Sequence, residues 1–289
     1  MILIFDIGGT KMRLAVSKNS KTILRSKIVG TPESFKDGIT LFKETAKELS
    51  KGEKIDKCVG CIAGLLDKKG EKIINSPNKK EWSGKPLKNS LEKAIGVPVK
   101  ILNDTVAAGL GEAVFGKGKR FNIVAYLTVS TGVGGARIAY KNIGKGLIGF
   151  EPGHQIIAPE GLFCGCRGKG HLEAYISGTA FQNRYGRDAE NIKDPKIWNE
   201  AAQNLAVGLN NVIVFWTPDV IILGGSMMLG KSHISIPLVK DYLKKMETIF
   251  PKIPPIIKAS LGDETGLYGA LAYLKANRLS EKTRADLHS

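Results

Sequence analysis

The sequence predicts a duplicated α/β fold, with two domains around a cleft. The chain has 289 residues, which is enough for two domains of ordinary size. Hydrophobic periodicity and the positions of Gly and Pro give the same order of elements, βββαβαβα, in both halves. Each half also opens with a strand, a glycine turn and another strand, in FDIGGTKMRL and TVSTGVGGARIA.

In the first half, short apolar stretches predict strands, and apolar residues at helical spacing predict helices. The helix after the fourth strand is bounded by Pro86 and Gly96, two residue types that favour helix ends. The expected elements are, in order, strands at 2–6, 12–17 and 22–29, a helix at 33–50, a strand at 56–62, a helix at 86–95, a strand at 98–102 and a helix at 104–115.

The second half follows the same rules, except that an insertion of about 45 residues, roughly 151–195, precedes its long helix. We therefore expect an N-terminal domain at 1–115, joined by the terminal helix near 264–289, and a C-terminal domain at 116–263. The expected elements of this half are strands at 122–130, 133–140 and 146–150, a helix at 196–215, a strand at 219–223, a helix at 235–248, a strand at 256–260 and a helix at 264–276.

The chain is strongly basic, with a net charge of +16 and a pI near 9.6. Its lysines are spread over surface stretches at 42–57, 67–80 and 236–258, without interleaved aromatic residues. This distribution is typical of a solvated surface and not of a nucleic-acid interface, so we expect no specific nucleic-acid partner. The excess charge would attract a polyanionic substrate such as ATP.

No apolar run approaches the ~18 residues that span a bilayer, so no membrane partner is expected. The start MILIFDIGGTK has no basic region and no cleavage site, which predicts a buried strand instead of a signal peptide. We therefore expect a cytoplasmic protein.

Two of the four cysteines, Cys58 and Cys61, form a C-x-x-C within the strand-like run KCVGCIAGLL. Residues three apart in a strand point to opposite faces, so these thiols could not easily share a metal ion. We expect both to be buried structural residues.

The two glycine turns are candidate phosphate sites. Glycine lets the backbone approach phosphate oxygens, and unblocked N–H groups supply hydrogen bonds. One such turn is weak evidence, whereas two at equivalent places in a duplicated fold are stronger. A third cluster, VIILGGSMMLG, follows the strand at 219–223, where an α/β sheet binds ligands at its carboxyl edge.

Asn103 and Asp104 lie where a strand ends and a helix begins. Taken alone, Asp104 could simply be the N-cap of that helix. With phosphate turns nearby it would be well placed to accept a proton from an attacking hydroxyl, as a general base. Asp6, which ends the first strand beside the first turn, is a candidate partner for phosphate-bound Mg²⁺.

The insertion contains two Cys and two His within 18 residues, which predicts a structural Zn²⁺ site formed by His154, Cys164, Cys166 and His171. Gly165 would give the Cys-x-Cys its flexibility, and Gly168 and Gly170 would let the chain turn back toward the ion. Four protein ligands would leave no position for an activated water, so the role would be structural. The neighbouring Glu151 and Glu173 could accept hydrogen bonds from sugar hydroxyls.

Together, these motifs resemble the ROK family of sugar kinases and sugar-responsive repressors, over nearly the whole chain. The resemblance implies a ribonuclease-H-like fold of the actin and hexokinase ATPase type. It rests on Asp6-Ile7-Gly8-Gly9-Thr10-Lys11, Ser130-Thr131-Gly132-Val133-Gly134-Gly135, Asn103-Asp104, Glu151-Pro152-Gly153-His154, Cys164-x-Cys166 with Glu173 and Ser177-Gly178, Leu223-Gly224-Gly225 and GDETGLYGALA at 262–272. NSPNKKEWSGKPL at 75–87 resembles the family's loop near the sugar.

The resemblance also implies roles for individual residues, with Asp104 as the catalytic base. The residues implied to bind the sugar are Gly64, Asn78, Asn103, Asp104, Glu151, His154 and Glu173. The residues implied to bind ATP and its Mg²⁺ are Asp6, Gly8, Gly9, Thr10, Lys11, Thr131, Gly132, Gly134, Gly224 and Gly225. The family usually has a third Cys where this chain has His171, which can also bind zinc.

The resulting expectation is an ATP-dependent hexose kinase, with phosphorylation of D-glucose at its 6-hydroxyl as the leading case. Fructose, mannose or an N-acetylhexosamine remain alternative acceptors, because these sugars share the same hydrogen-bonding groups. A non-catalytic sugar-responsive regulator is the alternative of another class. The phosphate motif begins at residue 6 with no helix-turn-helix before it, and Asp104 is present, so the kinase branch is favoured. We also expect a homodimer or higher homo-oligomer.

Overall fold

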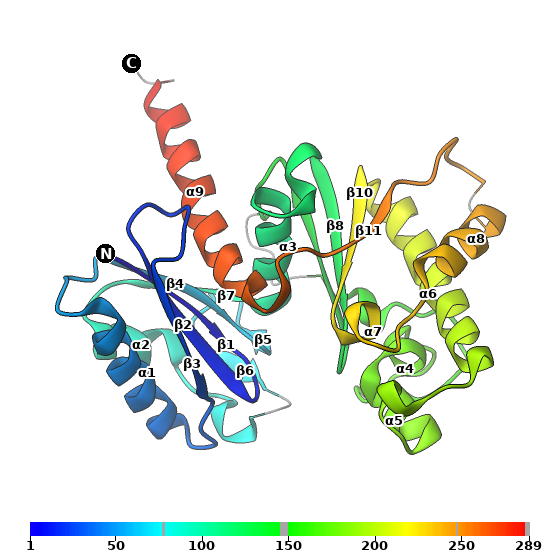
Figure 1. Cartoon of the computed structure of the whole chain (residues 1–289), viewed down its shortest axis with the longest axis horizontal. Coiled ribbons are helices and arrows are strands. Elements are labelled where there is room, and N and C mark those ends of the chain that lie inside the picture. The colour runs from blue at the N-terminus through cyan, green and yellow to red at the C-terminus, as the bar shows by residue number, and fades with distance from the viewer. Residues whose placement is uncertain (77–78, 145–149, 247, 287–289) are drawn as a thin grey trace. The chain divides into compact units, whose positions relative to one another are not determined.

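The computed structural model describes residues 1–76, 79–144, 150–246 and 248–286, with side chains described as far as residue 276 (Figure 1). The chain divides into two compact units. Unit 1 comprises Met1–Gly116, Lys141–Gly149 and Leu261–Ser289, and unit 2 comprises Lys117–Tyr140 and Phe150–Ser260.

Unit 1 is built on a five-stranded sheet of order β3-β2-β1-β4-β7. The first three strands form an antiparallel meander, while β4 and β7 run parallel to β1. The strands are β1 (Ile2–Ile7), β2 (Lys11–Ser17), β3 (Arg25–Gly30), β4 (Lys57–Ile62) and β7 (Val99–Asn103). The carboxyl ends of β1, β4 and β7 therefore share one edge of the sheet.

Helices cover both faces of this sheet: α1 (Phe35–Ser50) and α2 (Leu87–Ile95) one face, α3 (Asp104–Val114) and α9 (Thr265–Asp286) the other. Alternation along β1 sends Leu3 and Phe5 to the first core and Ile2 and Ile4 to the second. The same period of two turns Asp6 toward the α3 and α9 face.

The prediction for the C-x-x-C is confirmed. Cys58 and Cys61 are free and buried, and they belong to the cores on opposite faces of the sheet.

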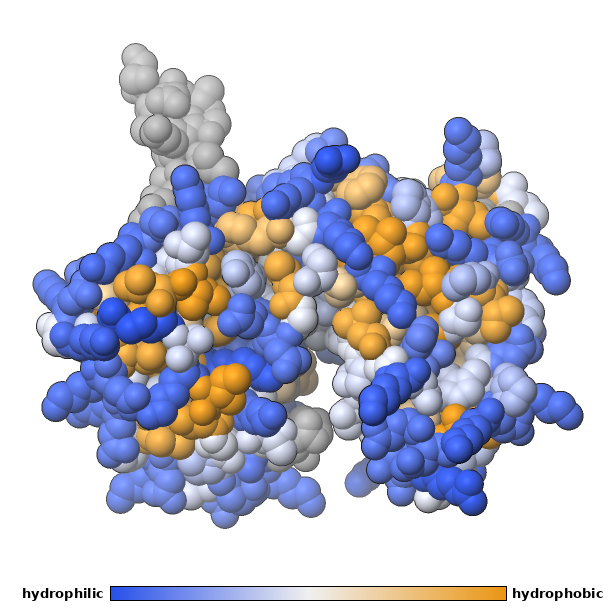
Figure 2. Space-filling model, in the orientation of Figure 1, coloured by the Kyte–Doolittle hydropathy of each residue, from blue (hydrophilic) through white to orange (hydrophobic). Residues whose placement is uncertain are grey.

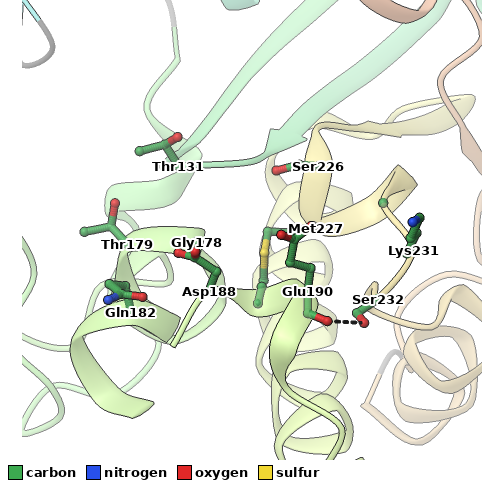
Figure 3. Close-up of a pocket in the computed structure, with 12 residues that line it drawn as sticks. Thr131, Gly178, Thr179, Gln182, Asp188, Glu190, Ser226, Met227, Lys231 and Ser232 are labelled. Atoms are coloured by element: carbon green, nitrogen blue, oxygen red, sulfur yellow. Dashed lines mark hydrogen bonds between the residues drawn. The ribbon is translucent and has the colours of Figure 1, made fainter. Parts of the chain in front are cut away.

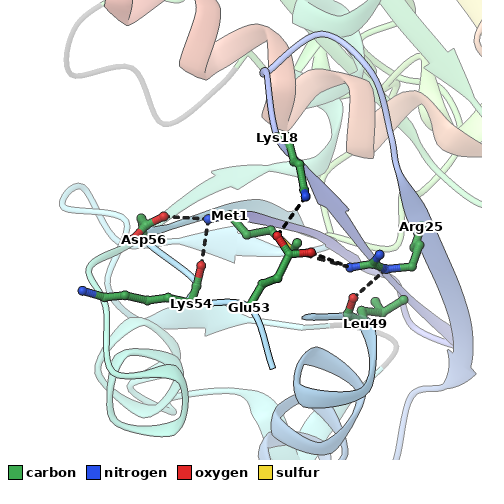
Figure 4. Close-up of polar contacts among 7 residues, drawn as sticks. All are labelled: Met1, Lys18, Arg25, Leu49, Glu53, Lys54 and Asp56. Carbon is green, nitrogen blue, oxygen red and sulfur yellow. Dashed lines mark hydrogen bonds and ion pairs between the residues drawn. The ribbon is translucent and has the colours of Figure 1, made fainter. Parts of the chain in front are cut away.

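Polar contacts fasten the loop between α1 and β4 to the strands beside it (Figure 4). The Glu53 carboxylate lies 2.9 Å from Lys18 and 3.7 Å from Arg25, and the amino group of Met1 lies 2.6 Å from Asp56. These cations lower the pKa of both exposed carboxyl groups, chiefly through hydrogen bonds from Lys18 and from the amino terminus. Exposed pairs of this kind add little stability, so they orient the loop more than they hold the unit together.

Unit 2 repeats the arrangement with a four-stranded sheet of order β11-β10-β8-β9. Its strands are β8 (Ile123–Val129), β9 (Val133–Ala139), β10 (Val220–Gly224) and β11 (Ile256–Lys258). Their order and directions match β7-β4-β1-β2 of unit 1. Phe150 bridges Gly135 at the place where a third strand is expected, but the rest of the predicted strand at 146–150 lies outside the described residues.

The main core of unit 2 lies between this sheet and its helices. Leu127 and Leu223 of the sheet pack in one cluster with Phe181, Leu209 and Met228 from three helices. The helices of the unit are α4 (Glu173–Ile176), α5 (Gly178–Tyr185), α6 (Pro195–Trp216), α7 (Ser226–Leu229) and α8 (Ile236–Met246). Asp194 caps α6, and Pro195 occupies its first turn, as helix starts favour.

Several short elements were not predicted, because segments of two to eight residues carry almost no periodic pattern. They include the hairpin of β5 (Leu65–Leu66) and β6 (Ile73–Asn75), the helices α4, α5 and α7, and the 3-10 turns η1 (Lys80–Trp82), η2 (Lys117–Arg120), η3 (Pro152–His154), η4 (Ala189–Asn191) and η5 (Gly262–Glu264). The last helix also continues ten residues beyond the predicted end at 276, through NRLSEKTRAD, which is rich in good helix formers.

Hydrophilic side chains are distributed over the visible face of both units instead of being gathered in one area (Figure 2). Among the described residues, every helix is too short or too polar to span a lipid bilayer.

Candidate active site

Asn103, not Asp104, caps α3. The β-region backbone of Asn103 ends β7, and its Oδ1 accepts hydrogen bonds from the backbone N–H groups of Thr105 (3.0 Å) and Val106 (3.1 Å). Its Nδ2 donates to the carbonyl of Gly64 at 3.4 Å. Because the cap position is taken by its neighbour, Asp104 is the first helical residue and is free for another role.

The Asp104 carboxylate uses only one of its two oxygens in hydrogen bonds to other described residues. Oδ1 accepts hydrogen bonds from the backbone N–H of Thr105 at 2.8 Å and from its hydroxyl at 3.4 Å, whereas Oδ2 accepts none from another described residue. Desolvation by burial raises the pKa of Asp104 to about 6, and the nearby charge of Asp6 contributes in the same direction. A carboxyl group that titrates near neutral pH suits proton transfer.

Asp6 lies at the carboxyl end of β1, held by groups from the two neighbouring strands. Arg13 of β2 approaches it to 3.9 Å, and the Cys61 thiol of β4 donates to its Oδ1 at 3.5 Å. Desolvation raises its pKa, and Arg13 partly offsets this effect. Carboxylate oxygen is a ligand that Mg²⁺ prefers, so the donor chemistry fits the predicted role of Asp6.

The β1–β2 turn is tight and braced from outside. The N–H of Gly8 donates to the carbonyl of Lys11 at 2.9 Å, and the Thr31 hydroxyl donates to the carbonyl of Gly8 at 2.8 Å. Among the described residues, the N–H groups of Gly9 and Thr10 find no acceptor. Two exposed donors at adjacent positions can bind an anion.

The β8–β9 turn of unit 2 has the same character. The N–H of Ser130 donates to Gly132 at 2.9 Å, and the start of α5 is tied to the turn through a bond of 2.7 Å from the N–H of Gly178 to the carbonyl of Ser130. Within the described ranges, the N–H groups of Thr131 and Gly132 donate to no protein acceptor. These groups remain available for phosphate oxygens.

A cavity of about 400 Å³ opens beside this turn, within unit 2 (Figure 3). Of its lining, Thr131 was predicted to lie in a phosphate turn, and Ser226, Met227 and Gly230 belong to the third glycine cluster, which was predicted to lie at a ligand-binding edge. The cavity is lined by Thr131, Gly178, Thr179, Gln182, Asp188, Ala189, Glu190, Ser226, Met227, Gly230, Lys231 and Ser232. The other groups come from α5 and η4 within the insertion and from Lys231 and Ser232 directly after the third glycine cluster, and the sequence pattern of these short elements does not by itself indicate a cavity.

Gly224, Gly225 and Gly134 do not line this cavity. Gly225 instead has a φ of +88°, and a Cβ there would collide with the carbonyl of Val129. It therefore lets β10 pass into α7 close against β8. In this way it positions Ser226, whose hydroxyl lies 3.1 Å from that of Ser130 in the turn.

The four predicted zinc ligands converge. Ligand atoms of His154, Cys164, Cys166 and His171 all lie within 4.8 Å of one another. Cys164 Sγ is 3.8 Å from His154 Nδ1, and Cys166 Sγ is 3.2 Å from His171 Nδ1. In a tetrahedral zinc site, Zn–S and Zn–N bonds of ~2.3 and ~2.05 Å place neighbouring N and S ligands roughly 3.6 Å apart. The residues present therefore fit a Zn²⁺ ion.

The loop that carries these ligands turns only in part as predicted. Gly165 has neither a positive φ nor a close neighbour, so the Cys-x-Cys does not depend on it, and the expected role of Gly165 is wrong. Left-handed backbone occurs at Arg167 (φ 74°), within a turn closed by a bond of 2.8 Å from the N–H of Cys164 to the carbonyl of Gly168, and also at Gly170 (φ 69°), where the chain was expected to turn. A Cβ at Gly168 would collide with the His171 ring, so this glycine gives the ring its place.

The two glutamates predicted to bind sugar differ in their surroundings. Glu173 accepts a hydrogen bond from the N–H of Val133 at 2.8 Å and another from the Cys164 thiol at 3.6 Å, so it links the metal loop to β9. Glu151 is exposed, and desolvation by the surrounding protein raises its pKa, which His154 partly offsets. Asn78 lies outside the described residues.

Comparison with known proteins identifies similar chains along almost the full length. A model of the ROK family matches residues 2–277. A glucokinase from Streptomyces coelicolor is 29% identical, covering 92% of this chain and 94% of the relative. An N-acetylmannosamine kinase from Haemophilus influenzae is 28% identical, covering 94% of this chain and 95% of the relative.

Solved structures show the same architecture. A ROK hexokinase from Thermus thermophilus has a TM-score of 0.82 at 28% identity, covering 96% of this chain and 99% of that one. A ROK glucokinase from Streptomyces griseus, solved with glucose and AMPPNP, has a TM-score of 0.76 at 26% identity, covering 93% and 97%. These similarities confirm the predicted fold class, the duplicated α/β fold of actin-like ATPases.

Proposed function

Because this chain belongs to the ROK family and the relatives named above are sugar kinases, we propose that it transfers the terminal phosphate of ATP to the 6-hydroxyl of D-glucose. The observation that carries the proposal is the environment of Asp104. Its carboxylate lies just after the carboxyl end of a strand, and Asn103 caps the following helix in its place. One carboxylate oxygen makes no hydrogen bond to another described residue, and the pKa of the group is about 6.

Asp104 acts as the general base in this proposal. The carboxylate accepts the proton of the sugar hydroxyl as its oxygen attacks the terminal phosphorus, which makes the oxygen a better nucleophile. A base whose pKa lies near the working pH is mostly ionised and still a strong enough acceptor. The loss of hydration on burial, and after it the like charge of Asp6, raise the pKa of Asp104 to this range.

The sugar ring would be held by hydrogen bonds from Asn103, Glu151, His154 and Glu173. Asn103 can use the second hydrogen of its Nδ2, since its Oδ1 caps α3. Glu151 is exposed and therefore accessible to sugar hydroxyls. Glu173 is already engaged with Val133, so it would contact sugar through its remaining lone pairs.

The donor would be ATP, with its phosphates at the glycine turns. The free N–H groups of Gly9, Thr10, Thr131 and Gly132 are suited to phosphate oxygens. Asp6 would hold Mg²⁺, which neutralises phosphate charge when bound.

The Cys and His cluster would hold one structural Zn²⁺. Four protein ligands complete a tetrahedral site, so the ion would brace the loop and activate no water. Bracing matters here because Glu173 lies beside Cys164, with its Oε1 3.6 Å from the Cys164 Sγ, and because His154 is itself a ligand. The sugar-binding side chains of the insertion would therefore depend on the metal.

The acceptor can be tested with a coupled assay of ADP formation from Mg·ATP over glucose, fructose, mannose, N-acetylglucosamine and N-acetylmannosamine. The similarity to an N-acetylmannosamine kinase makes that sugar the second candidate. We expect the highest kcat/KM for glucose and loss of turnover in Asp104→Asn. A higher kcat/KM for an N-acetylhexosamine would reassign the acceptor, and the absence of hexose-dependent ADP formation would overturn the proposed function.

A further inference from the structure

The cavity beside the β8–β9 turn has an acidic lining on a strongly basic chain. Asp188 and Glu190 line it, and Lys231 is the single cation among the described residues that do so. The whole chain has 43 Lys and Arg residues against 27 Asp and Glu residues. The lining therefore has two carboxylates against one ammonium group, a balance opposite in sign to that of the whole chain.

The rest of the lining suits an uncharged polar molecule. Thr179 and Gln182 of α5 lie across the cavity from Met227 of α7, which contributes apolar surface (Figure 3). Ser226 and Ser232 add hydroxyl groups, of which that of Ser232 donates to the backbone carbonyl of Glu190 at 3.3 Å and can accept a hydrogen bond from a ligand. The volume of about 400 Å³ falls within the range of small-molecule sites.

The cavity is continuous with the phosphate turn, because Thr131 belongs to both. The part of a phosphate donor that follows the phosphates at the turn would therefore have room in the cavity. In a nucleoside triphosphate this part is a ribose with two hydroxyls and a base, none of them charged. In inorganic polyphosphate it is a further run of anionic phosphoryl groups.

We propose that Asp188 and Glu190 make the donor site selective for a nucleoside triphosphate and against inorganic polyphosphate. The inference rests on the proposed function, since it concerns the donor of the same reaction. Carboxylates accept hydrogen bonds from ribose hydroxyls, whereas they repel additional phosphoryl groups. Discrimination between the two donors therefore comes from repulsion of the additional phosphoryl groups as much as from attraction of the ribose hydroxyls.

The test compares displacement of a fluorescent ATP analogue by three competitors in the absence of any hexose: ATP, tripolyphosphate and a linear polyphosphate several times longer. Tripolyphosphate occupies the turn alone, so it serves as the reference for the longer chain. In the wild-type protein we expect ATP to bind more tightly than the longer polyphosphate. In Asp188→Asn/Glu190→Gln we expect the affinity for the longer chain to rise on the order of tenfold relative to tripolyphosphate.

Asp241→Asn/Glu81→Gln is the matched control, since both residues are exposed carboxylates that do not line the cavity. It changes the net charge by the same two units as Asp188→Asn/Glu190→Gln. Equal displacement by ATP and the longer polyphosphate in the wild type, or an equal gain in Asp241→Asn/Glu81→Gln, overturns the inference. Because no hexose is present, a protein that phosphorylates no sugar can still show the expected displacement. Failure of the proposed function is thus distinguished from failure of donor selection.

Discussion

Asp104→Asn is expected to separate catalysis from folding, because the carboxylate proposed as the base destabilises the folded chain. Burial raises the pKa of Asp104 from 3.8 to about 6. The folded state therefore binds this proton more tightly than the unfolded state. The stability that the proton confers is present below pH 4 and is lost as the pH rises through about 6.

The magnitude follows from the shift. At ~1.4 kcal/mol per pKa unit, a shift of roughly two units lowers the free energy of unfolding by at most about 3 kcal/mol at pH 8. Asp104 is partly exposed, so solvent screening reduces this figure, and we expect about 1–2 kcal/mol. Asparagine keeps the size and an acceptor oxygen without the charge. The variant should therefore melt a few degrees above the wild type at pH 8, on the order of 2–4 °C per kcal/mol.

Thermal melts of both proteins at several pH values check this prediction. The gain in Tm should shrink below pH 6 and vanish near pH 4. Glu81→Gln, which removes an exposed carboxylate from the same unit, should show no such pH-dependent gain. In parallel, kcat should fall by at least the ~10²–10⁴-fold typical of a lost general base, with sugar binding retained. A lower Tm at pH 8, or near wild-type turnover, would refute the reasoning.

Three further predictions concern the pH profile, the metal and the charge. The wild-type kcat/KM should fall about tenfold per pH unit below pH 6, as Asp104 becomes protonated, and a flat profile down to pH 5 would contradict its role. Metal analysis of the purified protein should find one zinc ion per chain. His171→Cys should retain it, His171→Ala should lose it in part, and chelation should lower thermal stability and sugar affinity more than nucleotide affinity. Full activity of zinc-free protein in a strong chelator would exclude this role. DNA binding should be weak, indifferent to sequence and abolished by moderate salt, and nanomolar sequence-selective binding at physiological salt would favour a regulator instead.

The sequence alone was enough to predict the duplicated sheet and the residues proposed to carry the chemistry. Strand and helix periods are local properties, and β1, β4 and β7 follow the apolar runs closely. The Cys and His cluster was also predictable, because two Cys and two His within 18 residues of a glycine-rich loop match the ligand set of a structural zinc site. The glycine turns were recognisable because they recur at equivalent places in the two halves.

Only the tertiary structure decided which residue caps the helix, which groups bond to each other and which residues line the cavity. Whether Asn103 or Asp104 caps α3 depends on the residue at which β7 leaves the extended conformation, and either side chain can cap a helix. Glu173 is bound to Val133, 40 residues earlier, a contact that no local pattern encodes. The lining of the acidic cavity likewise combines Thr131, in the β8–β9 turn, with residues as far along the chain as Ser232. Long-range packing creates such sites, because it brings together short segments whose own sequence has no period to detect.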